Sequence, residues 1–373
     1  MIINTVNFQD GPVASGKLAN NTNLTFSPAG ALGIHLSLGG VNYKDKYFFG
    51  GFYTVGRIIR LNDLNDLTNY TSVDLGEGSN STLSIADVGI PGKIYVPLSP
   101  YNQSSLRLAL YEVDAESLAF TKVIDTTLAP LGATSYVYWL SIASDGTYMY
   151  IADNGPTCRI FKYDIATWTL QSTYTSAVAS RMGSISYVNG YLYGITYQVV
   201  VGANNHIVKI DPSTMSAVQL IDFGPYTTAN NYPFGSPPWF TAPGGIKKNM
   251  IAIGNKLYVA YGRSTTSSYS FYSFDINDLS QYQVINIPSF SMTGINNVSL
   301  FAVDTQLFLY NHSNYKICQY DTTTNSVVFI RTMPINPTLS ANSTICPSND
   351  IRVSYFNTLG GLAAGGKYTK QRH

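Results

Sequence analysis

Acidic and amide side chains recur at regular intervals in this sequence, each at the end of a run in which apolar and polar residues alternate. A ring of carboxylates at these positions could hold a cation or carry acid/base chemistry. The competing interpretation is structural, because an Asp or Asn side chain accepts backbone N–H groups two residues further on, and a following Ser or Thr adds a hydroxyl donor. We expect such Asx turns rather than a catalytic ring. The six positions are Asn62, Asp114, Asp164, Asp211, Asp275 and Asp321.

Histidine and cysteine, the other residues that bind metals or act in catalysis, are few and dispersed. The sequence contains no H-x-x-x-H pair, no Cys/His cluster, no G-x-S-x-G elbow, no Walker loop and no G-x-G-x-x-G fingerprint. We therefore expect no catalytic residue, no metal and no cofactor. The cysteines are expected to be small buried side chains, with a Cys318–Cys346 pair as the alternative. These residues are His35, His206, His312, His373, Cys158, Cys318 and Cys346.

One enzymatic alternative stays open at this level. Asp153, His206 and His312 all fall in or beside expected loops. A carboxylate with a histidine partner would suit a carbohydrate-active lyase or hydrolase if the side chains converged. The spacing of these residues does not indicate convergence, so the leading expectation is a protein without enzymatic activity.

The regular spacing of the turn residues indicates a repeat. The steps between them are 52, 50, 47, 64 and 46 residues, the first being the step from Asn62 to Asp114. Each turn is preceded by a strand such as "RIFKYD", and further upstream by a strand with a central aromatic, such as "KLYVAYG". Another strand lies before that one, and a fourth follows the turn, as in "YQVINI". Period-2 alternation joined by Asp-Gly, Asn-Gly and Gly-Asn turns predicts units of four antiparallel strands.

Repeating such a unit about every 45 to 50 residues is typical of a β-propeller. We therefore predict an all-β fold in which residues 1–373 form a single propeller domain. Six units run from about Gly33 to Pro334. Seven blades are preferred over six, because a closing blade built from the N- and C-terminal strands would remove the open edges of the ring.

Both chain ends contain segments that suit a closing blade. Residues 1–32 and 335–373 are expected to contribute to it, with "NDIRVSYFN" as a first strand and "MIINTVNF" and "NLTFSP" as outer strands. The basic residues 367–373 are expected to form a flexible tail.

Two of the repeated strands resemble a known family. "HIVKIDPSTMSAV" and "RIFKYDIATWTLQ" are similar to the repeat of the YVTN/quinoprotein-like β-propeller superfamily, and the match recurs over residues 33–334. The resemblance implies the architecture of that superfamily and not a function. The units lack a closing Trp-Asp pair, Gly-Gly doublets of the kelch type and a sialidase-like S-x-D-x-G-x-x-W box.

The connections between strands predict two unlike faces. In an antiparallel meander the first-to-second and third-to-fourth turns share one face, and the remaining connections share the other. The first face receives tight links such as "SDG" and "VNG", whereas the second, which we call the irregular face, receives the long connections. The longest runs from Gly224 to Asn249 and lies within the 64-residue step. Loops of this length in compact domains are usually functional.

This long run combines aromatic side chains with five prolines. Rigid aromatics bind sugar faces or protein patches with little loss of conformational freedom. The part "NNYPFGSPPWFTAPGG" (230–245) is expected to form neither a regular strand nor a helix, because proline removes backbone donors and fixes φ. The alternative is that the run covers the central channel as a plug. The candidate partner-binding residues are Tyr226, Tyr232, Phe234, Trp239 and Phe240.

Composition indicates what surrounds the protein. Charged residues make up 12% of the chain, about half the usual ~25%. Neutral hydroxyl and amide groups must therefore provide most of the hydrated polar surface. The net charge is +1 and the basic residues are scattered, which argues against a nucleic-acid partner. We expect no signal peptide and no membrane insertion, because the N-terminus lacks basic and apolar signal regions and no apolar run is long enough.

These features together predict a non-enzymatic, surface-exposed interaction module that binds a protein or glycan partner through the irregular face. An exterior type of surface without an export signal favours a structural or host-attachment protein of a virion or phage particle. The alternatives are the carbohydrate-active enzyme described above and a cytoplasmic propeller scaffold that docks peptides.

Overall fold

The structure is a computed structural model of the whole chain, and strands account for all regular secondary structure in the residues it describes. This confirms the all-β prediction. The described residues are 40–43, 46–50, 57–63, 66–77, 88–98, 107–127, 140–153, 158–177, 181–197, 204–225, 231–232, 250–263, 269–287, 298–303, 305–311 and 316–332.

The described strands form six antiparallel sheets in chain order, and within each sheet consecutive strands are neighbours. Sheet 1 contains β1 (Gly40–Tyr43), β2 (Lys46–Gly50), β3 (Arg57–Asp63) and β4 (Asp66–Asp74). Sheet 2 contains β5 (Lys93–Leu98), β6 (Arg107–Asp114) and β7 (Phe120–Thr127). Sheet 3 contains β8 (Leu140–Ser144), β9 (Tyr148–Asp153), β10 (Arg159–Asp164) and β11 (Leu170–Thr175).

The second half of the chain repeats this arrangement, with one added strand. Sheet 4 contains β12 (Arg181–Val188), β13 (Tyr191–Tyr197), β14 (Asn204–Asp211) and β15 (Ser216–Pro225). Sheet 5 contains β17 (Met250–Ile253), β18 (Lys256–Arg263), β19 (Tyr269–Asp275) and β20 (Tyr282–Ile287), together with the short β16 (Asn231–Tyr232). Sheet 6 contains β21 (Val298–Val303), β22 (Gln306–Asn311), β23 (Lys316–Asp321) and β24 (Ser326–Thr332).

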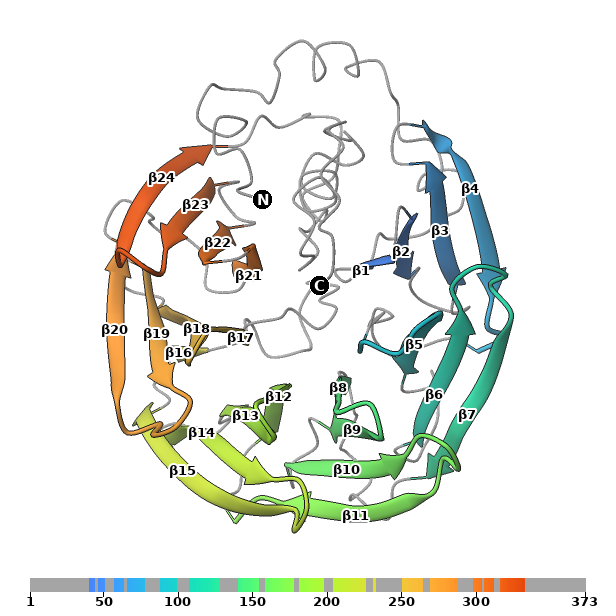
Figure 1. Cartoon of the computed structure of the whole chain (residues 1–373), viewed down its shortest axis with the longest axis horizontal. Helices are drawn as coiled ribbons and strands as arrows, with labels where there is room; N and C mark the ends of the chain where they lie inside the picture. The colour runs from blue at the N-terminus through green and yellow to red at the C-terminus, as the bar shows by residue number, and fades with distance from the viewer. Residues whose placement is uncertain are drawn as a thin grey trace.

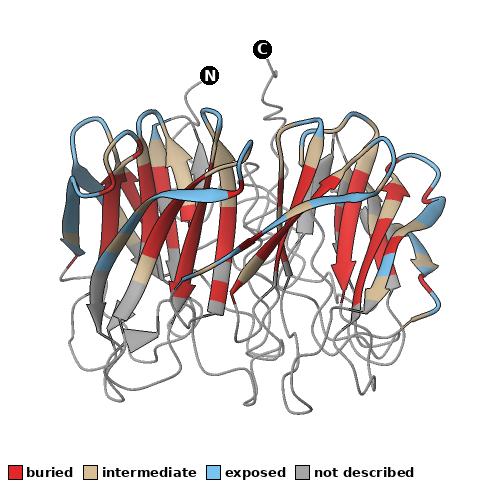
Figure 2. Ribbon diagram, turned by 90° about the horizontal axis from the view of Figure 1, so that it is seen from below, coloured by how far each residue is buried: buried red, intermediate tan, exposed pale blue. Residues whose placement is uncertain are grey.

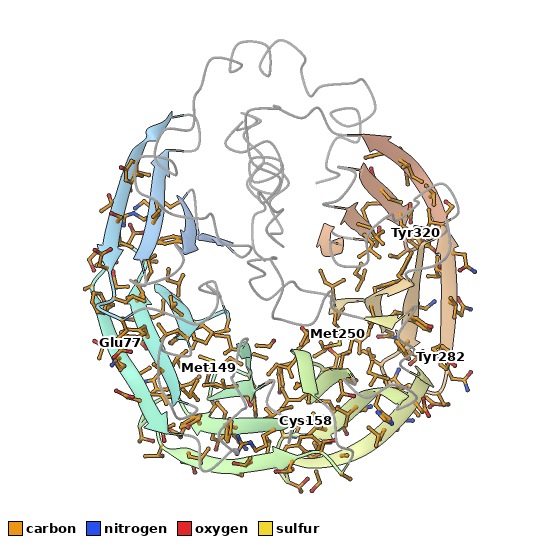
Figure 3. All side chains as sticks on the ribbon, turned by 180° about the vertical axis from the view of Figure 1, so that it is seen from behind. Glu77, Met149, Cys158, Met250, Tyr282 and Tyr320 are labelled. Carbon is orange, nitrogen blue, oxygen red and sulfur yellow. The ribbon has the colours of Figure 1, made fainter. Side chains whose placement is uncertain are left out.

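The six sheets follow one another around a common centre as the blades of a β-propeller (Figure 1). The fourth strands, from β4 to β24, lie at the rim, and the first strands lie nearest the centre. Met149 and Met250 accordingly lie on the inner part of their blades, whereas Glu77 and Tyr282 lie at the rim (Figure 3). The described strands do not close the ring between β24 and β4, and the predicted seventh blade falls on residues outside the described ones.

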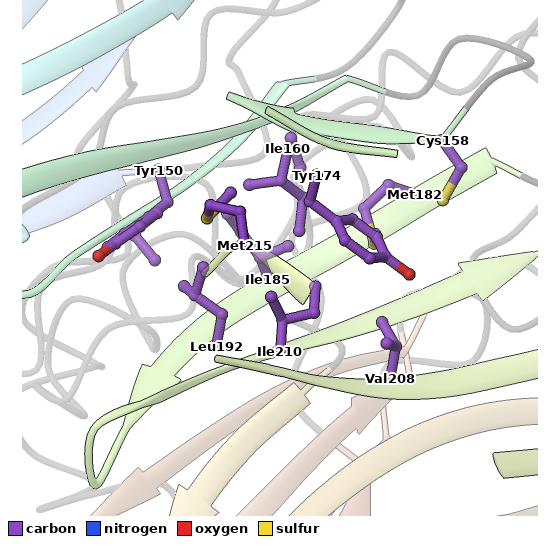
Figure 4. Packing of buried hydrophobic residues seen from close by; sticks show 12 residues of the cluster. Tyr150, Cys158, Ile160, Tyr174, Met182, Ile185, Leu192, Val208, Ile210 and Met215 are labelled. Carbon is purple, nitrogen blue, oxygen red and sulfur yellow. The ribbon is translucent and has the colours of Figure 1, made fainter. Parts of the chain in front are cut away.

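The core is divided into layers between consecutive sheets. Five clusters of described buried residues each join one sheet to the next, from sheets 1 and 2 to sheets 5 and 6. Between sheets 3 and 4, for example, Tyr150 and Ile160 meet Val208 and Ile210 (Figure 4). Burying each such side chain contributes about 1.5–3 kcal/mol. The fold is therefore held mainly by contacts between blades.

Strand alternation assigns each residue of a third strand to one of these layers. Residues one and three positions before the turn Asp face the preceding sheet, as Val208 and Ile210 do before Asp211. Residues two and four positions before it face the following sheet, as Ile207 does. We call these the rear and forward faces of a sheet. The central aromatics of the second strands, such as Tyr150 and Tyr193, also lie on the forward faces.

Three of the sheets have a polar residue on their forward face, two positions before the turn residue. In each case its side chain donates a hydrogen bond to the next sheet. Lys209 Nζ donates to the carbonyl oxygen of Ile276 at 2.9 Å, and Lys162 Nζ donates to that of Pro212 at 2.8 Å. Arg60 Nη1 donates to the carbonyl of Ala115 at 3.1 Å. In each case the acceptor belongs to the residue directly after the turn Asp of the next sheet. We call this residue the post-Asp residue.

The post-Asp residue also connects the two turns of its own sheet. The N–H of Ile276 donates to the carbonyl of Asn255 at 3.0 Å, and the N–H of Ile165 donates to that of Thr147 at 3.0 Å. Ala115 and Thr322 make the corresponding bonds. Pro212 has no N–H, so in sheet 4 only the carbonyl of this residue takes part. At Ala115 and Ile276, a single residue thus links two turns of its own sheet through its N–H and accepts a hydrogen bond from the preceding blade through its carbonyl.

Both buried lysines are held by aromatic rings as well as by the carbonyl. Lys162 is 9% exposed and its Nζ lies 3.9 Å from the ring centroid of Tyr148. Lys209 is 8% exposed and its Nζ lies 4.3 Å from that of Tyr191. A ring face and a carbonyl replace part of the water that each ammonium loses.

The third-to-fourth turns add a packing contact at the cost of backbone strain. Leu118, Trp168 and Met215 each stand four residues after the turn Asp and have φ values of 62°, 54° and 51°. A bulky residue in this left-handed region costs roughly 1–2 kcal/mol. Each side chain packs in the layer shared with the preceding sheet, as Trp168 does at 5.9 Å from the ring of Tyr95. Burial offsets the strain.

Replacing Lys209 by methionine should destabilise the protein. The variant keeps the aliphatic stem but loses the bond from Nζ to the Ile276 carbonyl, and we expect the free energy of unfolding to fall by about 1–3 kcal/mol. Urea unfolding followed by fluorescence measures the change. Lys256→Met removes a charge from sheet 5 without touching this bond and should shift the midpoint far less. Equal midpoints for Lys209→Met and wild type would contradict the role given to Lys209.

Candidate interaction site

The tight turns all lie on one face of the disc, as the strand order predicts. Figure 2 shows the described turns along its upper edge. The Asn-Gly link between β12 and β13 has φ values of 48° at Asn189 and 84° at Gly190, both in the left-handed region that a two-residue hairpin requires. The hairpin prediction is confirmed for this link.

Five of the six turn residues accept a backbone N–H group of their own turn. Four take the expected Asx bond from the residue two positions further on, and Asp164 accepts from the residue three positions further on. Asp164 Oδ1 accepts from the N–H and the hydroxyl of Thr167 at 2.9 and 3.0 Å, and Asp211 Oδ1 accepts from both groups of Ser213 at 2.8 and 2.7 Å. Asp114, Asp275 and Asp321 also accept backbone N–H groups. These bonds hold the pKa values of Asp114, Asp211 and Asp321 below their ordinary range, with a bond from the Gln306 side chain the largest cause at Asp321.

Asn62 differs in the contacts that the structure describes. Its Oδ1 accepts from Arg60 Nε at 2.8 Å, and its Nδ2 donates to Thr71 Oγ1 at 3.0 Å. Residues 64 and 65 lie outside the described ones. The Asx turn predicted at Asn62 therefore stays a prediction.

The turn carboxylates are consequently structural groups. Their acceptor oxygens are engaged by the backbone of their own turns, and they lie on successive blades around the disc rather than in one place. Among the described residues, no group of three or more His, Cys, Asp or Glu side chains could hold a metal ion.

The enzymatic alternative rests on residues of two neighbouring blades. Asp153 ends the second strand β9 and His206 lies near the start of the third strand β14, so both are at the irregular face. Burial lowers the pKa of His206, and the nearby Asp222 opposes this shift. His206 pairs with Asp222 across the β14–β15 ladder. His312 and the side chain of Asp153 lie outside the described parts, so of these three side chains the structure describes that of His206.

The long run at the irregular face begins after β15 and ends before β17, between sheets 4 and 5 as predicted. Of the five candidate binding residues, Tyr226, Phe234, Trp239 and Phe240 lie outside the described residues. Tyr232 lies in β16, where it pairs with Gly262 of β18, and Asn231 pairs with Arg263.

The presence of β16 corrects one prediction. The segment 230–245 was expected to contain no regular strand, yet Asn231 and Tyr232 pair with the last two residues of β18. Neither residue is a proline, and the residue before Pro233 is biased toward extended backbone. The inner edge of β18 is open beyond the end of β17, which pairs only with residues 256–259. A free ladder edge and an extended dipeptide explain the pairing.

A charged cluster that no sequence pattern predicted lies at the rim between sheets 1 and 2. Lys122 Nζ contacts the carboxylates of Glu77 and Asp125, the second at 3.2 Å, and lies 5.6 Å from the ring centroid of Tyr111. Burial raises the pKa of Tyr111, and Glu77 adds to this shift. The ammonium attracts a carboxylate that follows sheet 1 and one in sheet 2, so the cluster serves as a link between blades.

The remaining expectations concern thiols and membranes. Cys158 and Cys318 are buried, as predicted, and burial raises the pKa of the Cys318 thiol to about 12. Cys346 lies outside the described residues. None of the described segments forms a helix with the length and apolarity that crossing a membrane requires.

Comparison with known proteins supports the fold. No protein-family model matches the sequence, and neither does any curated protein. The chain is similar to the solved structure of hydrazine synthase from Kuenenia stuttgartiensis, with a TM-score of 0.52 and 10% identity over 78% of this chain and 77% of that chain. It is also similar to BamB from Moraxella catarrhalis, with a TM-score of 0.46 and 12% identity over 80% and 74% of the two chains. At 10% identity the likeness to hydrazine synthase concerns the fold alone. The architecture is that of a β-propeller.

Proposed function

We propose that this protein is a non-enzymatic interaction module that binds a protein or glycan partner through its irregular face. The proposed binding residues are Tyr226, Tyr232, Phe234, Trp239 and Phe240. The observation that carries the proposal is the pairing of β16 with β18, which attaches the aromatic-rich run to the inner strand of a blade.

This attachment supports a binding role because β18 is paired and packed within its blade. β18 is hydrogen-bonded along its other side to β19 over residues 256–261. Its buried residues Leu257, Tyr258 and Val259 pack against the sheets on either side. A run attached to such a strand is held by a rigid scaffold, and binding by rigid groups costs little conformational entropy.

The tight-turn face supports the same assignment by contrast. Its carboxylates are used in Asx turns, and its post-Asp carbonyls receive Lys162 and Lys209 from the preceding blades. A partner that engaged these groups would have to break bonds that hold the blades together. On the irregular face, loop residues can change without breaking the bonds that hold the blades together.

The second part of the proposal concerns location. Low charge together with abundant Tyr, Gly, Asn, Ser and Thr suits a structural or host-attachment protein on the exterior of a virion or phage particle. If so, the native protein should copurify with particles through density-gradient sedimentation. Recovery only as a free cytoplasmic species would favour the scaffold alternative instead.

The binding role is tested by removing two aromatics of the run. Tyr232→Ala combined with Trp239→Ala should reduce partner capture at least about tenfold, equivalent to ~1.4 kcal/mol, because aromatic anchors dominate binding energy. The full-length proteins are compared in lysate capture quantified by mass spectrometry and on a glycan array. The arm in which the signal falls identifies the partner as protein or glycan.

The matched control changes two exposed apolar residues away from the run. Tyr282 and Val218 are 40% and 55% exposed and lie on the rim strands β20 and β15. Tyr282→Ala with Val218→Ala should leave capture unchanged. Undiminished binding by the Tyr232/Trp239 variant, with circular dichroism matching wild type, would remove the run from the binding site.

A further inference from the structure

The fourth strand of each blade lies at the rim, and its outer edge pairs with no described strand (Figure 1). Such an edge presents a row of backbone N–H and C=O groups and can pair with a strand of another molecule. Proteins usually prevent this pairing with a charged residue, a proline or a β-bulge in the edge strand. The rim strands are β4, β7, β11, β15, β20 and β24.

Five of these six rim strands carry at least one such protection, and β20 carries none. The ladders that join the other five to their third strands each contain a register shift, whereas the ladder between β19 and β20 is regular throughout. β4, β7, β15 and β24 also contain charged residues. The sequence of β20, YQVINI, has neither a charge nor a proline. Among the described rim strands, β20 is the one with a regular and neutral edge.

The turn before β20 explains why its ladder is regular. Phe274 pairs with Tyr282, eight positions further on. The same position in sheets 3, 4 and 6 pairs seven positions further on, and a residue of the rim strand then bulges, such as Val218 in β15. In sheet 5 the additional residue lies in the turn instead. There Asp278 Oδ1 accepts from the N–H of Ser280 at 3.0 Å and from its hydroxyl at 2.7 Å.

Contacts within the blade hold both ends of β20. The ring centroid of Tyr282 lies 5.3 Å from that of Phe274 and 6.0 Å from that of Tyr272, so this ring lies against its own sheet at the rim (Figure 3). At the other end, Ile287 is buried between sheets 5 and 6. Val284, in the middle of the strand, is 47% exposed. The edge is therefore rigid, and its central side chain is apolar and open to solvent.

We propose that β20 pairs antiparallel with β20 of a second copy of this chain, so that the fifth sheets of two molecules form one continuous sheet. Six neutral residues place no like charges opposite each other in any antiparallel register, so the strand is compatible with itself. A strand of a different protein would meet no charge on β20 that selects it. The same patch is used on both copies, and such a two-fold contact closes at the dimer.

The direction of β20 determines how the two copies face. The strand begins after the tight turn that ends at Gln281 and finishes at the irregular face. Antiparallel pairing therefore points the irregular faces of the two copies in opposite directions. A contact of one short strand is small compared with stable interfaces, so we expect a reversible dimer with a dissociation constant of roughly micromolar size. The pairing does not depend on the binding role proposed for the irregular face.

Sedimentation velocity of the full-length chain tests the pairing. The wild type should change from monomer to dimer between about 1 and about 200 µM, the range in which a small interface assembles. Val284→Lys places like charges close to the two-fold axis and should weaken the dimer at least about tenfold. Val218→Lys is the matched control, because it makes the same change at a valine that is 55% exposed on the bulged strand β15. It should leave the dimer unchanged.

Mixing two variants separates a two-fold contact from a loss of folding. Val284→Glu alone should be as monomeric as Val284→Lys. An equimolar mixture of the two should form the dimer again, because opposite charges then meet near the axis. Circular dichroism of each variant should match that of the wild type.

Three results would overturn the proposal. They are a wild type that stays monomeric over the whole concentration range, a loss in Val218→Lys as large as that in Val284→Lys, and a mixture of the two Val284 variants that stays monomeric. A monomeric wild type whose capture of a protein from lysate is abolished by Val284→Lys would also overturn it, because a strand of another protein would then occupy the edge.

Discussion

Three of the contacts between neighbouring blades depend on the peptide group that follows an Asp turn. The turn Asp accepts backbone N–H groups and fixes the loop, and this places the next carbonyl where the preceding blade can reach it. Lys162 and Lys209 lie buried between blades because that carbonyl and an aromatic ring receive their ammonium groups. The third strands β10 and β14 therefore carry a polar residue inside an otherwise apolar layer, and this residue links its blade to the next.

This arrangement separates structure from recognition. The tight-turn face is used for joints between blades, while the irregular face carries the connections that vary in length. The 64-residue step shows the difference, since the added residues enter between β15 and β17 and leave the Asp211 and Asp275 turns intact. β16 then ties the added run to β18.

Much of the fold follows from local chemistry. Alternation and turn residues predict the four-strand units, and Asx chemistry predicts the role of Asp114 through Asp321. The hydrogen bonds from Lys162 and Lys209 to the next blade were not predicted. Both lysines occupy polar positions of an alternating pattern, and such positions usually face solvent. In a propeller both faces of these strands are buried, so a K-x-D ending is the signal that could have identified them. The pairing of β16 depends on an open edge of β18 that only the three-dimensional arrangement reveals.

Amide hydrogen exchange at the post-Asp residues tests the central claim most directly. Ala115, Ile165, Ile276 and Thr322 lie in surface turns, where amides ordinarily exchange fast. We predict that their N–H groups exchange as slowly as those of buried strand residues such as Ile195 and Leu257, because each donates to a carbonyl of the facing turn. Exchange at the rate of the exposed turn residue Ala166 would contradict it.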